Sequence, residues 1–322
     1  MDNVTHSLTG LALARAGLDR ICPRATFLLL VSANIPDSDI LGLLSGRLRY
    51  LEVHRGYTHS LLALPIMAVL SVALVALFSR QRLFWTRAWL LCCIGVASHL
   101  LLDWTNSYGI RLLLPFSSAW FHLDLVSLWD LAILSILLFA ALWPVLAGLV
   151  SQEIGAHKTR GRGVSIFALA FFLVWGLGRA YLHGEAVGQL NTRLYGGSIP
   201  MRAAAMPESI NPLHWRAIVE TAEAYRIYSQ FDPYQSFEPE LGTVYFKAPV
   251  TLAVISARRT ETFRYFSYFA RFPLWTESPA TLDQQEVTQV ELTDLRFGNP
   301  GQSLFRCTAL EDAQHRVIQA EF

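Results

Sequence analysis

The chain has 322 residues, of which 53% are hydrophobic and only 16% are charged, and its mean hydropathy is +0.35. This composition argues against a wholly soluble fold and indicates a membrane protein long enough for two domains. The formal net charge of +1 argues against a nucleic-acid partner, which would require a basic stripe. The four cysteines are scattered, and we interpret them as core residues.

The first part of the chain predicts a short helical hairpin. Val4–Leu18 and Ala25–Ile35 are apolar, but each is shorter than the about 20 residues that cross a bilayer. The second segment ends at Pro36, which cannot continue a helix. With Asp2 and no basic residue before Arg15, the N-terminus does not read as a cleavable signal peptide. We therefore expect a pair of partial or tilted helices.

Longer apolar runs follow and predict about four full spans. They complete a helical membrane domain over residues 1–182, and their bounds are Ser60–Phe78, Ala88–Leu102, Leu125–Val150 and Val164–Leu182. Basic residues cluster in two loops, and such loops face the cytoplasm. The loops contain Arg80, Arg82 and Arg87 in one case and Lys158, Arg160 and Arg162 in the other. Arg15, Arg20 and Arg24 are expected on the same side. This orientation places the segments with His54, His59, Asp103 and Asp124, together with the C-terminal tail, on the extracytoplasmic side.

Residues 183–322 are more polar and predict a soluble α+β domain. Pro212–Phe231 has the pattern of an amphipathic helix, and Thr260–Phe272 that of a shorter aromatic one. Strands are expected where the sequence alternates or runs apolar, at Thr243–Ser256, Glu286–Phe297 and Ser303–Leu310. The predicted fold is thus a membrane helical bundle followed by a small α+β domain.

The residues most suggestive of chemistry lie in His54–Ser60, just before the first long span. This heptapeptide contains His54 and His59, together with the permanent cation of Arg55. Neutral imidazole is the commonest protein ligand for zinc-like ions. Arg55 could neutralise a phosphoryl group or pair with Asp103, and the sequence does not decide between these roles.

Other acidic and imidazole side chains fall in segments predicted to share the same face. His99 and Asp103 are four residues apart, so they project from one side of a helix. Asp37 and Asp39 follow Pro36; either alone would be read as a turn or cap residue, but mixed carboxylate and imidazole shells suit divalent metals. His6, near the N-terminus, is a further candidate metal ligand. Asp39 and Asp124 are candidates for a general base or for orienting a ligand.

These motifs together resemble the membrane-bound, metal-dependent hydrolase family typified by the YdjM inner-membrane protein. The resemblance covers roughly residues 1–135 and also includes Asn106, Gly109 and Asp130. It implies a bacterial inner-membrane protein with a divalent-metal site and hydrolase activity. More remotely, the order of His and Asp residues is similar to that of zinc-dependent phospholipase C and the P1-type nucleases, which cleave phosphodiesters.

We therefore expect a hydrolase that acts on a phosphoester of a membrane lipid or lipid-linked substrate. One or two ions, zinc or alternatively manganese, would be held by a set of six residues: His6, Asp37, His54, His59, His99 and Asp103. Arg55, Asp39 and Asp124 would assist catalysis. Two alternatives stay open: a transport or binding protein that holds metal or protons without hydrolysis, and a scaffold whose metal only stabilises the fold.

Overall fold

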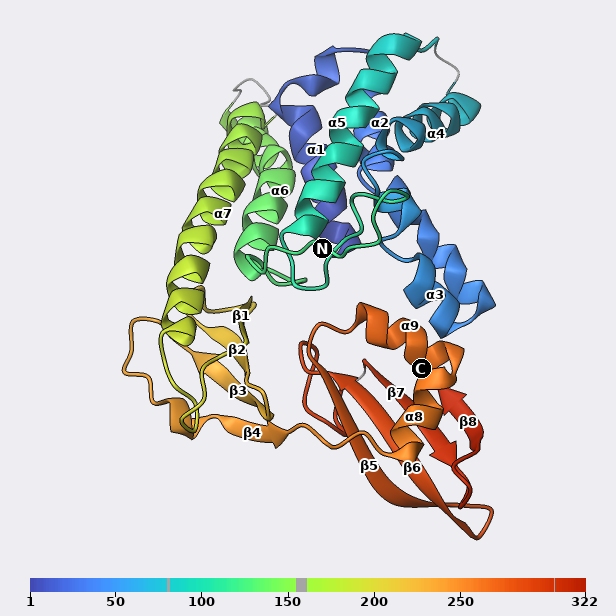
Figure 1. Ribbon diagram of the computed structural model, residues 1–322. Coiled ribbons are helices and arrows are strands. Elements are labelled where there is room, and N and C mark those ends of the chain that lie inside the picture. The colour runs from blue at the N-terminus through green and yellow to red at the C-terminus, as the bar shows by residue number, and fades with distance from the viewer. Residues whose placement is uncertain (80–81, 155–160, 304) are drawn as a thin grey trace. The chain divides into compact units, whose positions relative to one another are not determined.

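The structure is a computed structural model that describes residues 1–79, 82–154, 161–303 and 305–322. The chain divides into two compact units (Figure 1). The helical unit comprises residues 1–45, 53–183 and 207–212, and the sheet unit comprises residues 46–52, 184–206 and 213–322. Arg80, Lys158 and Arg160, whose charges contributed to the predicted orientation, lie outside the described residues.

The helical unit contains both short and long helices. The α-helices are α1 (Asn3–Ala16), α2 (Ala25–Ser32), α3 (Arg47–Val53, mostly in the sheet unit), α4 (Leu64–Phe78), α5 (Trp85–Trp104), α6 (Leu131–Ile154) and α7 (Arg162–Asn191, which continues into the sheet unit). Three short 3₁₀ segments are η1 (Leu18–Arg20), η2 (Ile35–Ser45) and η3 (Tyr57–His59). The predicted hairpin of two short N-terminal helices corresponds to α1 and α2.

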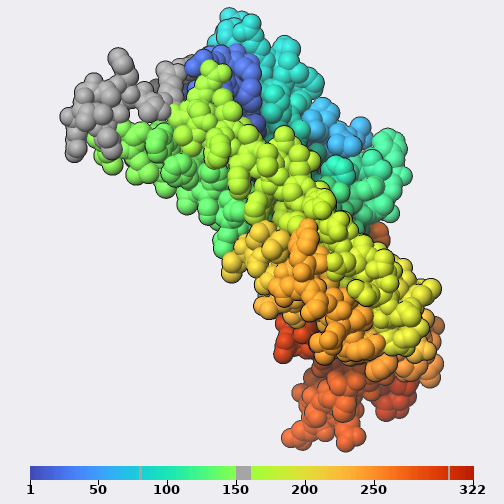
Figure 2. Space-filling model, turned by 90° about the vertical axis from the view of Figure 1, so that its left-hand side faces the viewer, coloured from blue at the N-terminus to red at the C-terminus, as the bar shows by residue number. Residues whose placement is uncertain are grey.

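Three helices, α5, α6 and α7, are long and apolar enough to cross a membrane. Only 17% of the apolar windows of α6 and α7 is buried within the protein, so most of their apolar surface faces outward. The helix α7 crosses the surface shown in Figure 2. Its residues Leu173, Val174 and Leu177 are each about two-thirds exposed. Such a face is suited to lipid contact.

The prediction that Ser60–Phe78 is a full span is not confirmed. The helix α4 has only 15 residues, and it is bent by 93° from the preceding segment, residues 47–59. Ser60 closes a turn, because its hydroxyl oxygen accepts a hydrogen bond from the Ala63 amide at 3.1 Å. Pro65 then occupies the first turn of α4, where its missing N–H costs nothing. A second bend, of 42°, separates α2 from η2, so up to five spans result if each bent pair crosses as one.

Two glycines allow α2 to pack closely against the helices on either side of it. A Cβ at Gly10 of α1 would lie 2.8 Å from the backbone oxygen of Leu29, and one at Gly95 of α5 would lie 1.9 Å from Ser32 Oγ. Small residues let helix backbones approach closely within membranes. The C-terminal end of α2 is therefore held directly against the middle of α5.

Arg15 of α1 compensates for a proline within α6. Pro144 has no N–H to donate to the carbonyl of Ala140 one turn earlier. The Arg15 guanidinium donates from Nη1 to Ala140 O at 3.2 Å and to Ala141 O at 2.7 Å. A buried carbonyl without a partner would be costly in an apolar environment. The pairing explains why a charged residue is retained in this apolar hairpin.

We expect Arg15→Met to destabilise the protein by about 1–3 kcal/mol, the typical cost of leaving a buried acceptor unsatisfied. In a Pro144→Ala background the restored amide can bond Ala140, so the same substitution should cost markedly less. Thermal unfolding of the four proteins of this double-mutant cycle in detergent measures the coupling. Equal losses in both backgrounds would contradict the compensation.

Besides most of α3 and the end of α7, the described residues of the sheet unit form two four-stranded antiparallel sheets and two helices. The first sheet has the order β1 (Arg202–Pro207), β2 (Trp215–Glu220), β3 (Ala224–Phe231) and β4 (Thr243–Phe246). The second has the order β5 (Pro273–Leu282), β6 (Gln285–Asp294), β7 (Arg306–Glu311) and β8 (Val317–Glu321). The helices are α8 (Leu252–Arg259) and α9 (Glu261–Phe269), with a 3₁₀ turn, η4, at Pro239–Leu241.

The amphipathic helix predicted over Pro212–Phe231 is wrong, because these residues form the hairpin of β2 and β3. Thr221 and Ala224 close its turn, with the Thr221 amide donating to Ala224 O at 2.8 Å. The alanine and glutamate residues of this stretch favour a helix, but pairing of the strands buries Trp215 and Ile218 completely. Of the strand predicted over Thr243–Ser256, only β4 forms; a loop follows it, and from Leu252 the chain belongs to α8. The aromatic helix within Thr260–Phe272 is confirmed as α9.

Candidate metal centre

Three segments of the helical unit deliver four acidic and imidazole side chains to one place. Asp37 lies in η2, where the chain turns after α2, and the Asp37 amide donates to the Asn34 carbonyl at 3.1 Å. His59 ends η3. His99 and Asp103 lie one turn apart on α5 and are fully buried, as is His59. We refer to these four residues, Asp37, His59, His99 and Asp103, as the central group.

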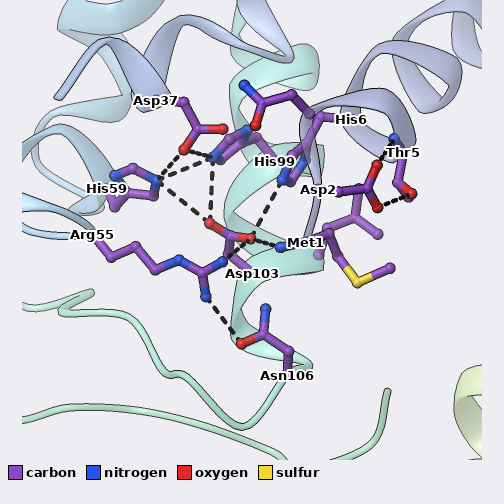
Figure 3. Close-up of polar contacts among 12 residues, drawn as sticks. Met1, Asp2, Thr5, His6, Asp37, Arg55, His59, His99, Asp103 and Asn106 are labelled. Carbon is purple, nitrogen blue, oxygen red and sulfur yellow. Dashed lines mark hydrogen bonds and ion pairs between the residues drawn. The ribbon is translucent and has the colours of Figure 1, made fainter. Parts of the chain in front are cut away.

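The polar atoms of the central group face one another (Figure 3). The Nε2 atoms of His59 and His99 are 3.1 Å apart. His59 Nε2 lies 3.4 Å from both Asp37 Oδ1 and Asp103 Oδ2. His99 Nε2 lies 3.7 Å from Asp37 Oδ1 and 3.4 Å from Asp103 Oδ2. Two nitrogens and two oxygens therefore enclose a common point.

The hydrogen bonds on the far sides of the two imidazoles determine what they present to this point. The carbonyl oxygen of Ala33 can only accept, so His99 Nδ1, 2.8 Å away, carries the proton. His59 Nδ1 lies 3.2 Å from Asp39 Oδ2 and 2.9 Å from Thr58 Oγ1, which favours a proton there as well. Each neutral ring then directs an unprotonated Nε2 inward. Histidine ligands of metals are oriented in the same way.

The residues of the central group fit a small divalent cation. Four ligand atoms placed tetrahedrally at about 2.0–2.1 Å from an ion are about 3.3 Å from one another, close to the spacings observed. Two imidazole nitrogens and two carboxylates also form a donor set suited to zinc or manganese. Four inward-facing acceptors repel one another unless a cation or protons lie between them. The geometry and the donor chemistry thus agree.

A second cluster, the outer group, contains Asp37, Asp39 and His54, whose ligand atoms also lie within 4.8 Å of one another. His54 Nδ1 is 3.0 Å from Asp39 Oδ1. The other oxygen of Asp39 accepts from the Arg55 amide at 2.9 Å and from Thr58 Oγ1 at 3.1 Å. Asp39 therefore contacts both histidines of the His54–Ser60 motif and its backbone. Asp37 belongs to both groups.

His6 lies beside the central group on α1. Asp2 caps this helix, because its carboxylate accepts hydrogen bonds from the Thr5 amide and hydroxyl at 2.9 and 2.6 Å. His6 stacks on His99 with 3.8 Å between ring centroids, and its Nε2 is 3.3 Å from Asp103 Oδ1. The amino group of Met1 contacts the same oxygen (Figure 3). His6 thus approaches the carboxylate of Asp103 from the side opposite the central group.

Arg55 pairs with Asp103, one of the two roles that the sequence left open. Its Nη2 is 3.1 Å from Asp103 Oδ1, and its Nη1 donates to Asn106 Oδ1 at 3.0 Å. The guanidinium also lies over the Tyr108 ring, 4.7 Å from the centroid. Arg55 is almost wholly buried and has a left-handed backbone, with a φ of 52°. The strained backbone and the network around the cation fix it beside the carboxylate.

Asp124, like the predicted ligand His6, lies outside the two groups. It lies in the loop between α5 and α6, with its Oδ2 4.0 Å from His122 Nδ1. Neither metal-binding group found among the described residues includes it.

The sequence did not reveal the groups that hydrogen-bond to the metal-ligating residues and to Arg55 and hold them in place. Thr58 and Asn106 lie within or near recognised motifs, but their partners depend on folding. The Ala33 carbonyl, which sets the tautomer of His99, leaves no signal in the side-chain pattern. It takes part because the helix α2 ends there, against α5.

Comparison with known proteins identifies two relatives and one family. The chain is 25% identical over 311 residues to the uncharacterized protein YfhP of Bacillus subtilis (strain 168). The aligned region covers 94% of this chain and 88% of YfhP. The inner membrane protein YbcI of Escherichia coli (strain K12) is 34% identical over 119 residues, 35% of this chain and 67% of YbcI. No solved structure matches. The profile described as "YdjM inner membrane protein" matches residues 1–185, which include both groups of ligands, α5, α6 and most of α7. The chain belongs to the YdjM inner membrane protein family.

Proposed function

We propose that the protein is a membrane-embedded, divalent-metal-dependent hydrolase that acts on a phosphoester of a lipid or lipid-linked substrate. The observation that carries the proposal is the central group, in which two imidazole nitrogens and two carboxylate oxygens surround one point at spacings of 3.1–3.7 Å. A bound divalent ion would supply Lewis-acid activation of water and of a phosphoryl oxygen. The metal identity that best suits the donors is zinc, followed by manganese.

The surrounding residues have roles that follow from their contacts. Asp39 orients His54 and His59 by accepting from their Nδ1 atoms and fixes the intervening backbone. Because both oxygens of Asp39 already accept hydrogen bonds, an orienting role suits this residue better than that of a general base. Arg55 compensates the negative charge of buried Asp103 and places a cationic side chain beside the central group, where it would neutralise a phosphoryl group. A catalytic role for Asp124 stays a prediction, which Asp124→Asn would test.

A lipid substrate is supported by the apolar surface of the segments that carry the ligands. Leu41 and Leu44 of η2 are 65% and 86% exposed, although they lie only a few residues from Asp37 and Asp39. Leu61 and Leu62, immediately after the His54–Ser60 motif, are each 54% exposed. Exposed leucines beside a polar site favour contact with acyl chains while a headgroup reaches the ligands.

The test is hydrolysis of phospholipid and lipid-linked diphosphate probes in mixed micelles with added zinc or manganese. We expect His59→Ala and Asp103→Asn to reduce turnover by more than about 100-fold, because even groups that only orient metal ligands contribute about 10–100-fold. Asp19→Asn, in η1 beyond the C-terminal end of α1, is the matched control and should retain activity. Undiminished turnover in the two ligand variants would refute the mechanism, and metal binding without cleavage of any probe would refute the substrate class.

The positions of the two helix breaks favour one alternative, a metal or proton transport protein. Asp37 follows the bend after α2, and His59 precedes the bend before α4. Transporters often place ion sites at interrupted helices. Metal-dependent flux in proteoliposomes without product release would support this alternative over hydrolysis.

A further inference from the structure

An apolar groove lies at the end of the helical unit that is remote from the metal-binding groups. It runs along α2, from Arg24 at its start to Val31, and against the end of α4; it has a volume of about 370 Å³ and is lined by Arg24, Phe27, Val31, Leu74, Val75, Phe78 and Ser79. This volume falls within the roughly 300–1,000 Å³ typical of small-molecule sites. Measured along α5, the level of Ala88 is about 22 Å from that of Asp103. The groove is therefore separate from the candidate active site.

Arg24 is the charged residue of an otherwise apolar lining. It is exposed, and its guanidinium carbon lies 5.8 Å from the centroid of the Phe27 ring. Among the residues that the structure describes, no carboxylate forms an ion pair with Arg24. The groove thus presents a cation at one end of a surface suited to hydrocarbon.

Further cations flank the same end of the bundle. Cys22, Ala25, Val75, Leu83 and Ala88 belong to one buried cluster, so the start of α2, the end of α4 and the start of α5 meet there. Arg82 and Arg87, next to Leu83 and Ala88, are both exposed. Trp85, 58% exposed, adds an amphipathic ring of the kind found at the headgroup level of membranes.

We propose that this groove is a binding site for an anionic phospholipid, with an acyl chain between α2 and α4 and the phosphate at Arg24. An outward-facing apolar groove between membrane helices is in contact with lipid tails. The positive charge at its end then selects among headgroups, because a zwitterionic lipid carries a second charge that Arg24 repels. Basic pockets between helices recognise anionic lipids in this way. The site is independent of the proposed hydrolase activity and lies at the opposite end of α5.

The experiment is native mass spectrometry of the delipidated full chain in detergent, titrated with phosphatidylglycerol or with phosphatidylcholine of identical acyl chains. We expect the wild type to prefer phosphatidylglycerol. Arg24→Gln should reduce phosphatidylglycerol affinity by roughly fivefold, since one basic residue at a membrane surface contributes about this much, while phosphatidylcholine binding stays unchanged. Val31→Trp, which fills the groove, should weaken binding of both lipids.

Arg20→Gln is the matched control, because Arg20 is exposed in η1 near the same end but does not line the groove. It should bind both lipids like the wild type. Equal affinity of the wild type for the two lipids would overturn the proposal, and so would an unchanged preference in Arg24→Gln. Equal loss of preference in Arg20→Gln and Arg24→Gln would overturn it too, because it would show diffuse attraction to a basic face. Wild-type binding of both lipids by Val31→Trp would exclude the groove as the binding site.

Discussion

His59→Ala and Asp103→Asn are each expected to abolish tight metal binding by the detergent-purified protein. His59→Ala removes one of the four ligand atoms of the central group, and Asp103→Asn replaces an anionic carboxylate by a neutral amide, which is a much weaker ligand for zinc or manganese. The loss of affinity should exceed about 100-fold, since removing a group that merely orients a ligand already costs about 10–100-fold. Metal content after zinc or manganese loading and desalting, measured by elemental analysis, gives the result directly.

The wild type should retain one or two ions per chain. Asp19→Asn changes a carboxylate in the same chemical way far from the ligands and should retain metal like the wild type. A well-folded wild-type protein that retains neither zinc nor manganese would rule out the metal centre and with it the hydrolase. Metal retained in both ligand variants would show that the ion is bound elsewhere.

The second large effect is expected for Arg55→Met in the absence of metal. Asp103 is completely buried, and Arg55 is its cationic side-chain partner at 3.1 Å. Removing one partner of a buried ion pair typically costs about 3–5 kcal/mol. We expect a loss near the lower end of this range, because the Met1 amino group remains beside Asp103. Unfolding in detergent with a chelator present should show this loss. Added zinc should restore part of the stability, because an ion in the central group also compensates Asp103.

Two further variants separate this effect from general damage. Arg55→Met combined with Asp103→Asn removes both charges and should be more stable than Arg55→Met alone. Arg49→Met removes a cation whose side chain is 58% exposed, and an exposed pair contributes only about 0–1 kcal/mol. Wild-type stability of Arg55→Met in chelator would show that the pair does not compensate the buried carboxylate.

The sequence was sufficient to predict the family and to predict that candidate ligands from distant segments come together. The four-residue spacing of His99 and Asp103 places both on one face of any helix, and Pro36 ends the helix before Asp37. The residue types of the His54–Ser60 motif indicate metal binding, whatever fold surrounds them. The resemblance to the YdjM family drawn from these residues is confirmed by the match to residues 1–185.

Features that depend on contacts between distant segments were not accessible. An apolar run such as Ser60–Phe78 has the composition of a span, but the turn at Ser60 and Pro65 shortens it to α4. The stretch before Phe231 favours a helix locally, and only cross-strand burial makes it a hairpin. The bond from His99 to the Ala33 carbonyl depends on the close approach of α2 and α5, which Gly95 permits.

The position of the ligands along the chain bears on how the protein is made. The two groups found among the described residues draw only on residues 37–103. During synthesis, α5 completes the central group while α6, α7 and both sheets have yet to leave the ribosome. An ion captured then would join the end of α2 to α5 and offset the entropy of closing the intervening loop. The supply of metal during translation would thus affect when α5 packs against the hairpin of α1 and α2: early, with an ion bound, or only after α6 has packed.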